Sequence, residues 1–120
     1  MQNWVSWFEI PATNFERAVQ FYNGLFDIEL HTVDMMGTKM GIFPADGPSG
    51  AVVSGEGYTP TENGTLVYLN GGEDLNVALN KITGLGGNVL VPKTHIGDEM
   101  GYFAIFTDTE GNKIALHSNQ

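Results

Sequence analysis

The sequence predicts an α+β fold in which two βαβββ repeats form a curved mixed sheet around a central cavity. Three observations carry this prediction: alternating apolar runs typical of strands, two amphipathic helical segments, and a pattern that restarts after a linker rich in turn-forming residues. A chain of 120 residues has the length of one domain, here 1–120. Within it we expect one repeat over 4–54, a linker over 55–64 and a second repeat over 65–118.

The first repeat opens with a predicted strand over 4–10, where polar and apolar residues alternate. Thr13 and Glu16 fit a capping box, in which Thr13 begins a helix and Glu16 reaches back to it. Apolar residues at helical spacing follow, and Gly24 is expected to end the helix. The remainder is predicted to form strands at 27–35, 39–43 and 51–54, with a loop at 44–50.

The second repeat follows the same order. A strand at 65–70 precedes a helix at 73–83, a strand at 88–95 and a hairpin at 102–118. Phe8 and Ile10 of the first repeat correspond to Val67 and Leu69 of the second. Because two such units can pair their sheets, we expect the faces without helices to curve around a shared cavity, a usual place for a ligand.

The composition limits the classes of partner. The net charge is −9, and the five basic residues are scattered, which disfavours nucleic acid and anionic membranes as partners. Cysteine is absent, so disulfides and thiolate zinc sites are excluded. No apolar run is long enough to span a membrane, and the first residues do not resemble a secretory signal. The expected location is therefore cytoplasmic.

The closing hairpin is the most informative stretch. An apolar run over 102–106 is followed by a turn over 108–112, whose Asp, Gly and Asn residues favour tight turns. The last strand, 113–117, alternates, so that Ala115 and His117 share one face and Ile114 and Leu116 share the other. A small residue beside an ionisable one suits a cavity wall.

These residues resemble the vicinal oxygen chelate superfamily, which includes glyoxalase I, extradiol dioxygenases and bleomycin resistance proteins. Three stretches carry the resemblance: FEIPATNFERAVQFYNGLF, LNVALNKITGLGGNVLVPKT and GYFAIFTDTEGNKIALHS. The most specific element is Asp-x-x-Gly-Asn followed by a short strand. The sequence looks closest to small bacterial single-domain members described as glyoxalase-like. The resemblance implies a small organic ligand and a homodimer, with the pocket within one chain or across two.

The resemblance also implies metal ligands at three positions that hold Trp7, Leu66 and Ala115 here. None of these side chains binds a divalent metal, so we predict no metal and no cofactor at the family's usual site. The alternative is a displaced site that uses Glu9 and His117, since Glu and His are proper ligands for zinc or iron. His31 and His95 lie on matching strands of the two repeats and are further candidates.

Two functions remain open from the sequence. The first is binding without chemistry in an aromatic-lined pocket, because flat molecules stack well on aromatic walls. The expected ligand-binding residues are Trp7, Leu66, Tyr68, His95, Tyr102 and Ala115, with Phe106 as a further candidate, whereas Trp4, Phe8 and Phe15 are assigned to the core.

The second function is a glyoxalase-like enzyme of the lyase, isomerase or dioxygenase type. It would use either the displaced metal site or metal-free acid–base chemistry by Glu9 and His117, because a glutamate partly desolvated by Trp7 and Tyr68 suits proton transfer. The sequence leaves open whether the chain is an enzyme.

Overall fold

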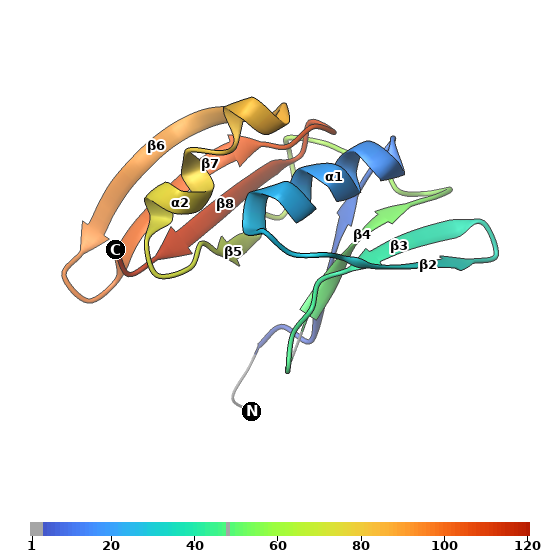
Figure 1. Cartoon of the computed structure of the whole chain (residues 1–120), viewed down its shortest axis with the longest axis horizontal. Helices are drawn as coiled ribbons and strands as arrows, with labels where there is room; N and C mark the ends of the chain where they lie inside the picture. The colour runs from blue at the N-terminus through green and yellow to red at the C-terminus, as the bar shows by residue number, and fades with distance from the viewer. Residues whose placement is uncertain (1–3, 48) are drawn as a thin grey trace.

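Each repeat folds into its own four-stranded sheet, and α1 lies between the two sheets (Figure 1). The computed structural model describes residues 4–47 and 49–120. The strand order is β1-β4-β3-β2 in the first sheet and β5-β8-β7-β6 in the second. The β1–β4 and β5–β8 pairs are parallel and the others are antiparallel, so each sheet is mixed. The predicted α+β architecture of two βαβββ repeats is therefore confirmed.

The elements lie close to their predicted positions and differ mainly at their ends. The first repeat contains β1 (Trp7–Pro11), α1 (Phe15–Phe26), β2 (His31–Met35), β3 (Thr38–Ile42) and β4 (Ser49–Ser54). The second contains β5 (Tyr68–Asn70), α2 (Leu75–Leu79), the 3-10 turn η1 (Thr83–Leu85), β6 (Asn88–Gly97), β7 (Gly101–Thr107) and β8 (Lys113–Ser118). The predicted loop over 44–50 includes Pro48, which lies outside the described residues.

Helix α1 begins and ends differently from the prediction. Asn14, not Thr13, is the N-cap, and its side chain accepts a hydrogen bond from the Arg17 amide at 3.1 Å. Glu16 does not reach back; its carboxylate lies 3.4 Å from Lys39 Nζ. The helix continues beyond Gly24 to Phe26 and ends where Asp27 adopts a left-handed conformation. The capping-box prediction is wrong because a carboxylate from the second repeat binds the backbone amide of Thr13, as described below.

Helix α2 is shorter than its predicted span of 73–83. It begins after Asp74, whose carboxylate accepts from the Asn76 amide at 2.9 Å. After Leu79 the chain tightens into η1, and Gly86 follows in a left-handed conformation. The glycines at 84, 86 and 87 favour this early end because glycine lowers helix stability.

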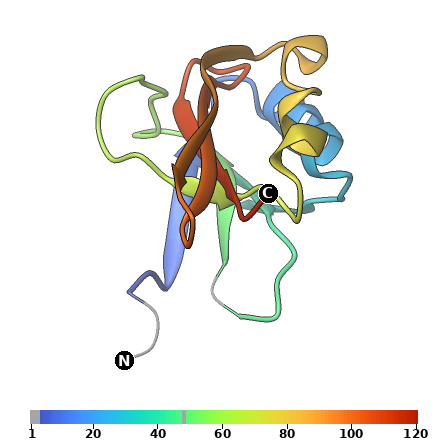
Figure 2. The same ribbon diagram turned by 90° about the vertical axis from the view of Figure 1, so that its left-hand side faces the viewer.

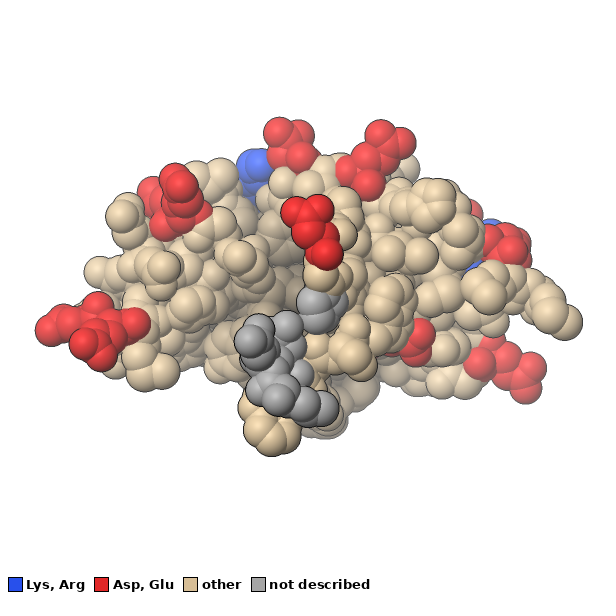
Figure 3. All heavy atoms as spheres, turned by 90° about the horizontal axis from the view of Figure 1, so that it is seen from below, with Lys and Arg blue, Asp and Glu red and all other residues tan. Residues whose placement is uncertain are grey.

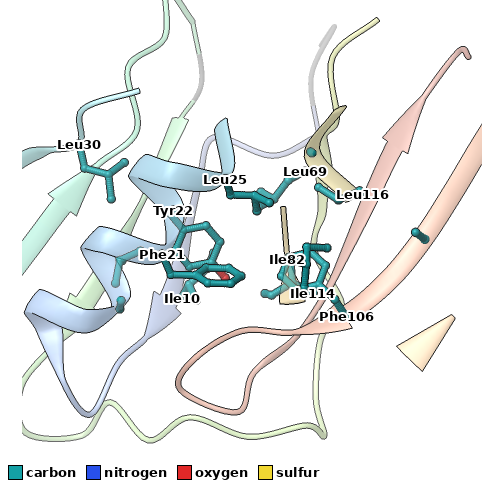
Figure 4. Close-up of a cluster of buried hydrophobic side chains, with 14 of the residues drawn as sticks. Ile10, Phe21, Tyr22, Leu25, Leu30, Leu69, Ile82, Phe106, Ile114 and Leu116 are labelled. Carbon is teal, nitrogen blue, oxygen red and sulfur yellow. The ribbon is translucent and has the colours of Figure 1, made fainter. Parts of the chain in front are cut away.

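The hydrophobic core is shared by the two repeats. Phe21 of α1 packs against Phe106 of β7, with ring centroids 5.9 Å apart, and both are fully buried (Figure 4). Phe106 is thus a core residue and not a pocket residue. Phe8 and Phe15 are partly buried, and Phe8 packs against the core. The assignment of Trp4 to the core is wrong: Trp4 is 91% exposed because β1 begins only at Trp7.

One junction between the repeats is closed by the turn between β7 and β8. Glu110 Oε1 accepts from the amides of Thr13 at 2.9 Å and Asn14 at 2.7 Å, and its Oε2 meets Arg17 Nε at 2.7 Å. Asp108 accepts from the buried Tyr22 hydroxyl at 2.7 Å. We call this set of contacts the closed junction.

The equivalent junction at the other end of the repeats is open. Between the end of α1, the segment 43–45 and the start of α2 lies a cavity of about 760 Å³. The start of α2 is held instead by the chain end, because the Leu75 amide donates to the Gln120 carbonyl at 2.7 Å. We call this region the open junction.

Candidate functional site

A cavity of about 640 Å³ lies on the second sheet, on the face that carries no helix. We call this the open face. Its lining includes side chains from β5, from β8 and from the β6–β7 hairpin: Tyr68, Asn70, Ile96, Met100, Phe103 and His117. Most of these residues are aromatic, sulfur-containing or aliphatic, and two offer polar groups that can orient a ligand.

The strand register explains why these residues meet. Asn70, His117 and Phe103 form one row across β5, β8 and β7, since His117 is the register partner of both others. The neighbouring row contains Tyr68 and Ala115. Ala115 is fully buried there and does not line the cavity. The structure therefore brings the predicted residues Tyr68 and His117 together, with Ala115 beside them on the same face.

His117 and Asn70 are each held by one backbone group. His117 Nε2 lies 2.6 Å from the Met100 carbonyl oxygen, across the cavity from β5. Asn70 Oδ1 accepts from the Gly72 amide at 2.9 Å, two residues further along the chain. These bonds fix the orientation of both side chains.

Tyr102 and His95 lie on the opposite face of the second sheet. Tyr102 pairs with Ser118 and with His95, whereas Phe103 pairs with His117. The His95 and Tyr102 rings are 5.0 Å apart, and Lys93 Nζ lies 4.6 Å above the Tyr102 ring. The expectation that Tyr102 and His95 line a cavity with His117 is wrong, because the register of the β7–β8 hairpin places Phe103 on that face.

Glu9 and Trp7 lie on the first sheet. Trp7 Nε1 donates to Glu9 Oε2 at 3.2 Å, and the Tyr58 hydroxyl donates to Glu9 Oε1 at 3.0 Å. Tyr58 belongs to the linker, which forms a loop at the side of the molecule (Figure 2). Its hydrogen bond to Glu9 raises the pKa of the Tyr58 hydroxyl. Glu9 is not among the residues around the cavity that His117 lines, so this cavity does not bring the two predicted acid–base residues together.

The positions of the expected metal ligands hold no ligand cluster. Leu66 is half-buried and precedes β5, and it does not line the cavity. His31 is exposed on β2, and His95 lies near Asp98, with Nε2 3.9 Å from a carboxylate oxygen. Within residues 4–47 and 49–120, no three His, Asp or Glu side chains converge as a metal site requires.

Eight of the ten residues around this cavity were not predicted from the sequence, among them Asn70, Ile96, Met100 and Phe103. Asn70 carried a usable signal, since it stands two residues after Tyr68 and therefore shares its face of β5. Ile96 and Met100 lie near the tip of a hairpin between two strands, where period-two reasoning ends. Phe103 could be assigned to the cavity only from the register of the β7–β8 hairpin, which the sequence pattern does not specify.

Comparison with known proteins agrees with this architecture. Residues 4–116 match the family described as Glyoxalase/Bleomycin resistance protein/Dioxygenase superfamily. A glyoxylase-like domain-containing protein from Didymella fabae is 34% identical over 118 residues, which covers 93% of this chain and 91% of the relative. The chain therefore belongs to the glyoxalase/bleomycin resistance protein/dioxygenase superfamily, as the sequence resemblance predicts.

Solved structures show the same fold. A glyoxalase/bleomycin resistance protein from Albidiferax ferrireducens T118 superposes with a TM-score of 0.76 at 16% identity, covering 98% of this chain and all of the other. A glyoxylase/bleomycin resistance protein/dioxygenase domain from Frankia sp. EAN1pec gives a TM-score of 0.74 at 14% identity, with both chains covered completely. At such identities the likeness concerns the fold. Neither helix of the described residues has the length and apolar character needed to cross a bilayer.

Proposed function

We propose that this protein binds a small, flat organic molecule in the cavity on the open face of the second sheet. The observation that supports this most directly is the composition of the cavity: two aromatic rings, Tyr68 and Phe103, accompany Met100 and Ile96 around the polar groups of Asn70 and His117. Tyr68 is 54% exposed, so its ring is accessible to a ligand. Aromatic and thioether side chains bind flat apolar surfaces well.

The charge distribution favours a ligand without strong negative charge. Seen from below the view of Figure 1, the surface carries scattered acidic side chains and few basic ones (Figure 3). The cavity lining contains no lysine or arginine among the described residues. A ligand anion would therefore lack the cationic partner that usually offsets its desolvation.

The enzymatic alternative has weaker structural support. Acid–base chemistry by Glu9 and His117 requires both groups at one substrate, yet they lie on different sheets. Glu9 accepts from Trp7 and Tyr58, and His117 is bound to the Met100 carbonyl. We therefore favour binding over a reaction by this pair.

A titration with flat aromatic fragments, followed by the backbone amide signals in NMR, tests the proposal. We expect the signals of Asn70, Phe103 and His117 to shift, and Phe103→Ala to weaken binding about tenfold, because a stacking surface is lost. Trp4→Ala is the matched control, since it removes an exposed aromatic residue outside the cavity and should leave affinity unchanged. Fragments that leave the cavity signals unshifted would contradict the proposal.

We also propose that the protein is a cytoplasmic homodimer. Met35 and Met36, at the tip of the β2–β3 hairpin, are 60% and 103% exposed, and exposed apolar groups of this kind favour contact with another chain. Sedimentation velocity should show a dimer at micromolar concentration, and the double variant Met35→Ser with Met36→Ser should shift it toward monomer. A native chain that sediments as a monomer throughout would refute the dimer.

A further inference from the structure

The amide of Asn70 can be assigned without ambiguity. A backbone N–H can only donate, so the Asn70 atom 2.9 Å from the Gly72 nitrogen must be the carbonyl oxygen. The other end of the amide is therefore the NH₂ group, a donor with two hydrogens. Among the hydrogen bonds of the described residues, none uses this NH₂ group. Asn70 thus offers the cavity a donor.

The imidazole of His117 can be assigned by the same reasoning. A carbonyl oxygen can only accept, so the ring nitrogen 2.6 Å from the Met100 oxygen, Nε2, carries a hydrogen. In the neutral ring, Nδ1 is then an acceptor. Within the part of the chain that the structure describes, Nδ1 has no hydrogen-bond partner. His117 thus offers the cavity an acceptor.

The donor and the acceptor lie on neighbouring strands. Asn70 of β5 and His117 of β8 are register partners in a parallel pair, so their side chains leave the same face about 4.8 Å apart at the backbone. Both line the cavity. The sheet therefore presents one donor and one acceptor side by side.

We propose that this pair recognises the edge of a cyclic amide, a lactam, within a flat heteroaromatic ligand. A lactam carries a C=O acceptor next to an N–H donor in one plane, which complements the Asn70 NH₂ group and His117 Nδ1. Phe103, the other register partner of His117, and Tyr68, in the next row, provide apolar surface for the rest of the ring. The inference rests on the proposed binding function and adds the chemical class of the ligand.

A carboxylate and a lactone match the pair less well. A carboxylate has no donor for His117 Nδ1 and meets a protein of net charge −9. A lactone has the shape of a lactam but places an oxygen where Nδ1 needs a hydrogen. The difference in affinity between a lactam and a lactone therefore isolates the contribution of the ligand N–H group that donates to His117 Nδ1.

The experiment compares two probes of equal shape, 1(2H)-isoquinolinone as the lactam and isocoumarin as the lactone. Affinities are measured by NMR titration of the native protein. We expect isoquinolinone to bind about tenfold more tightly, because isocoumarin leaves Nδ1 facing another acceptor. The His117 Nδ1 resonance should shift with isoquinolinone and much less with isocoumarin.

Asn70→Asp tests the other half of the pair. The aspartate keeps an oxygen for the Gly72 amide, so the local turn survives, but it replaces the NH₂ donor with an acceptor. We expect it to weaken isoquinolinone binding about tenfold. Asn88→Asp is the matched control, because Asn88 is an exposed asparagine of the same sheet that does not line the cavity, and the change adds the same charge; this variant should bind normally.

The outcomes separate the two levels of the proposal. Equal affinity for isoquinolinone and isocoumarin overturns the lactam inference and leaves the binding function intact, as does an Asn88→Asp variant that loses as much affinity as Asn70→Asp. Failure of both probes and of every flat aromatic fragment to shift the cavity signals overturns the binding function and the lactam inference together.

Discussion

The two repeats share one topology but meet differently at their two junctions. At the closed junction, the β7–β8 turn places the fully buried side chain of Glu110 on the start of α1, where it binds two amides and the Arg17 guanidinium. At the open junction, the corresponding segment between β3 and β4 borders a cavity of about 760 Å³. The start of α2 there is held by the Gln120 carbonyl.

The difference shows which contact between the repeats depends on a specific residue. The closed junction depends on charge-assisted hydrogen bonds around one carboxylate, a class of bond stronger than neutral ones. At the open junction, the start of α2 is held by a backbone bond to the Gln120 carbonyl and by the local cap of Asp74, and neither contact joins α2 to the first repeat. We therefore expect stability to be sensitive to substitution at the closed junction and tolerant at the open one.

The largest expected effect follows from Glu110→Ala. The change leaves the Thr13 and Asn14 amides without their acceptor and Arg17 without its partner, so the free energy of unfolding should fall by about 2 kcal/mol. Urea denaturation followed by circular dichroism measures this.

The matched control for Glu110→Ala is Glu73→Ala. Glu73 is an exposed glutamate at the open junction, and its removal should change the free energy of unfolding by less than about 0.5 kcal/mol. Equal losses of unfolding free energy in the two variants would contradict the expected difference between the junctions.

A smaller effect should appear in the free energy of unfolding at acidic pH. Burial alone would raise the pKa of Glu110, but hydrogen bonds from Arg17, Asn14 and Thr109 outweigh it and hold the pKa below its ordinary value of 4.5. A carboxylate with a lowered pKa stabilises the fold above its unfolded pKa, and this contribution is lost as the pH falls through the folded pKa.

The stability difference between the native chain and Glu110→Gln should therefore be full at pH 7 and shrink below about pH 4.5. Urea denaturation at pH 7, 5 and 3 provides the comparison. Glu73→Gln, measured in parallel, should show little difference at any of these values. A difference for Glu110→Gln that stays constant from pH 7 to pH 3 would show that its charge does not act at the closed junction.

The fold was accessible from the sequence because its signals are local. Alternation along β8 placed Ala115 and His117 on one face and Ile114 and Leu116 on the other, as the structure shows. The N-cap of α1 was not accessible in the same way. Thr13 carries a good local capping signal, but Glu110, which binds its amide, is remote in sequence and lies in a turn where a glutamate carries no signal.

The candidate site was accessible only in part, for a related reason. The common face of His117 and Tyr68 could be predicted because each belongs to a short alternating strand. Tyr102 and Phe103 could not be told apart, since the pairing of β7 with β8 decides which of two adjacent aromatic residues faces the cavity. The polar contribution of Asn70 depended on its bond to the Gly72 amide, which the sequence pattern does not specify.

The bond between Glu110 and the Thr13 amide also constrains the order of folding. The two residues are 97 positions apart, so the start of α1 cannot receive its acceptor until almost the whole chain has been synthesised. A first repeat that has just left the ribosome lacks the acceptor for this helix end. Its Phe21 and Tyr22 also lack their contacts with the second repeat. The start of α1 therefore gains this acceptor only after the closing turn has been synthesised.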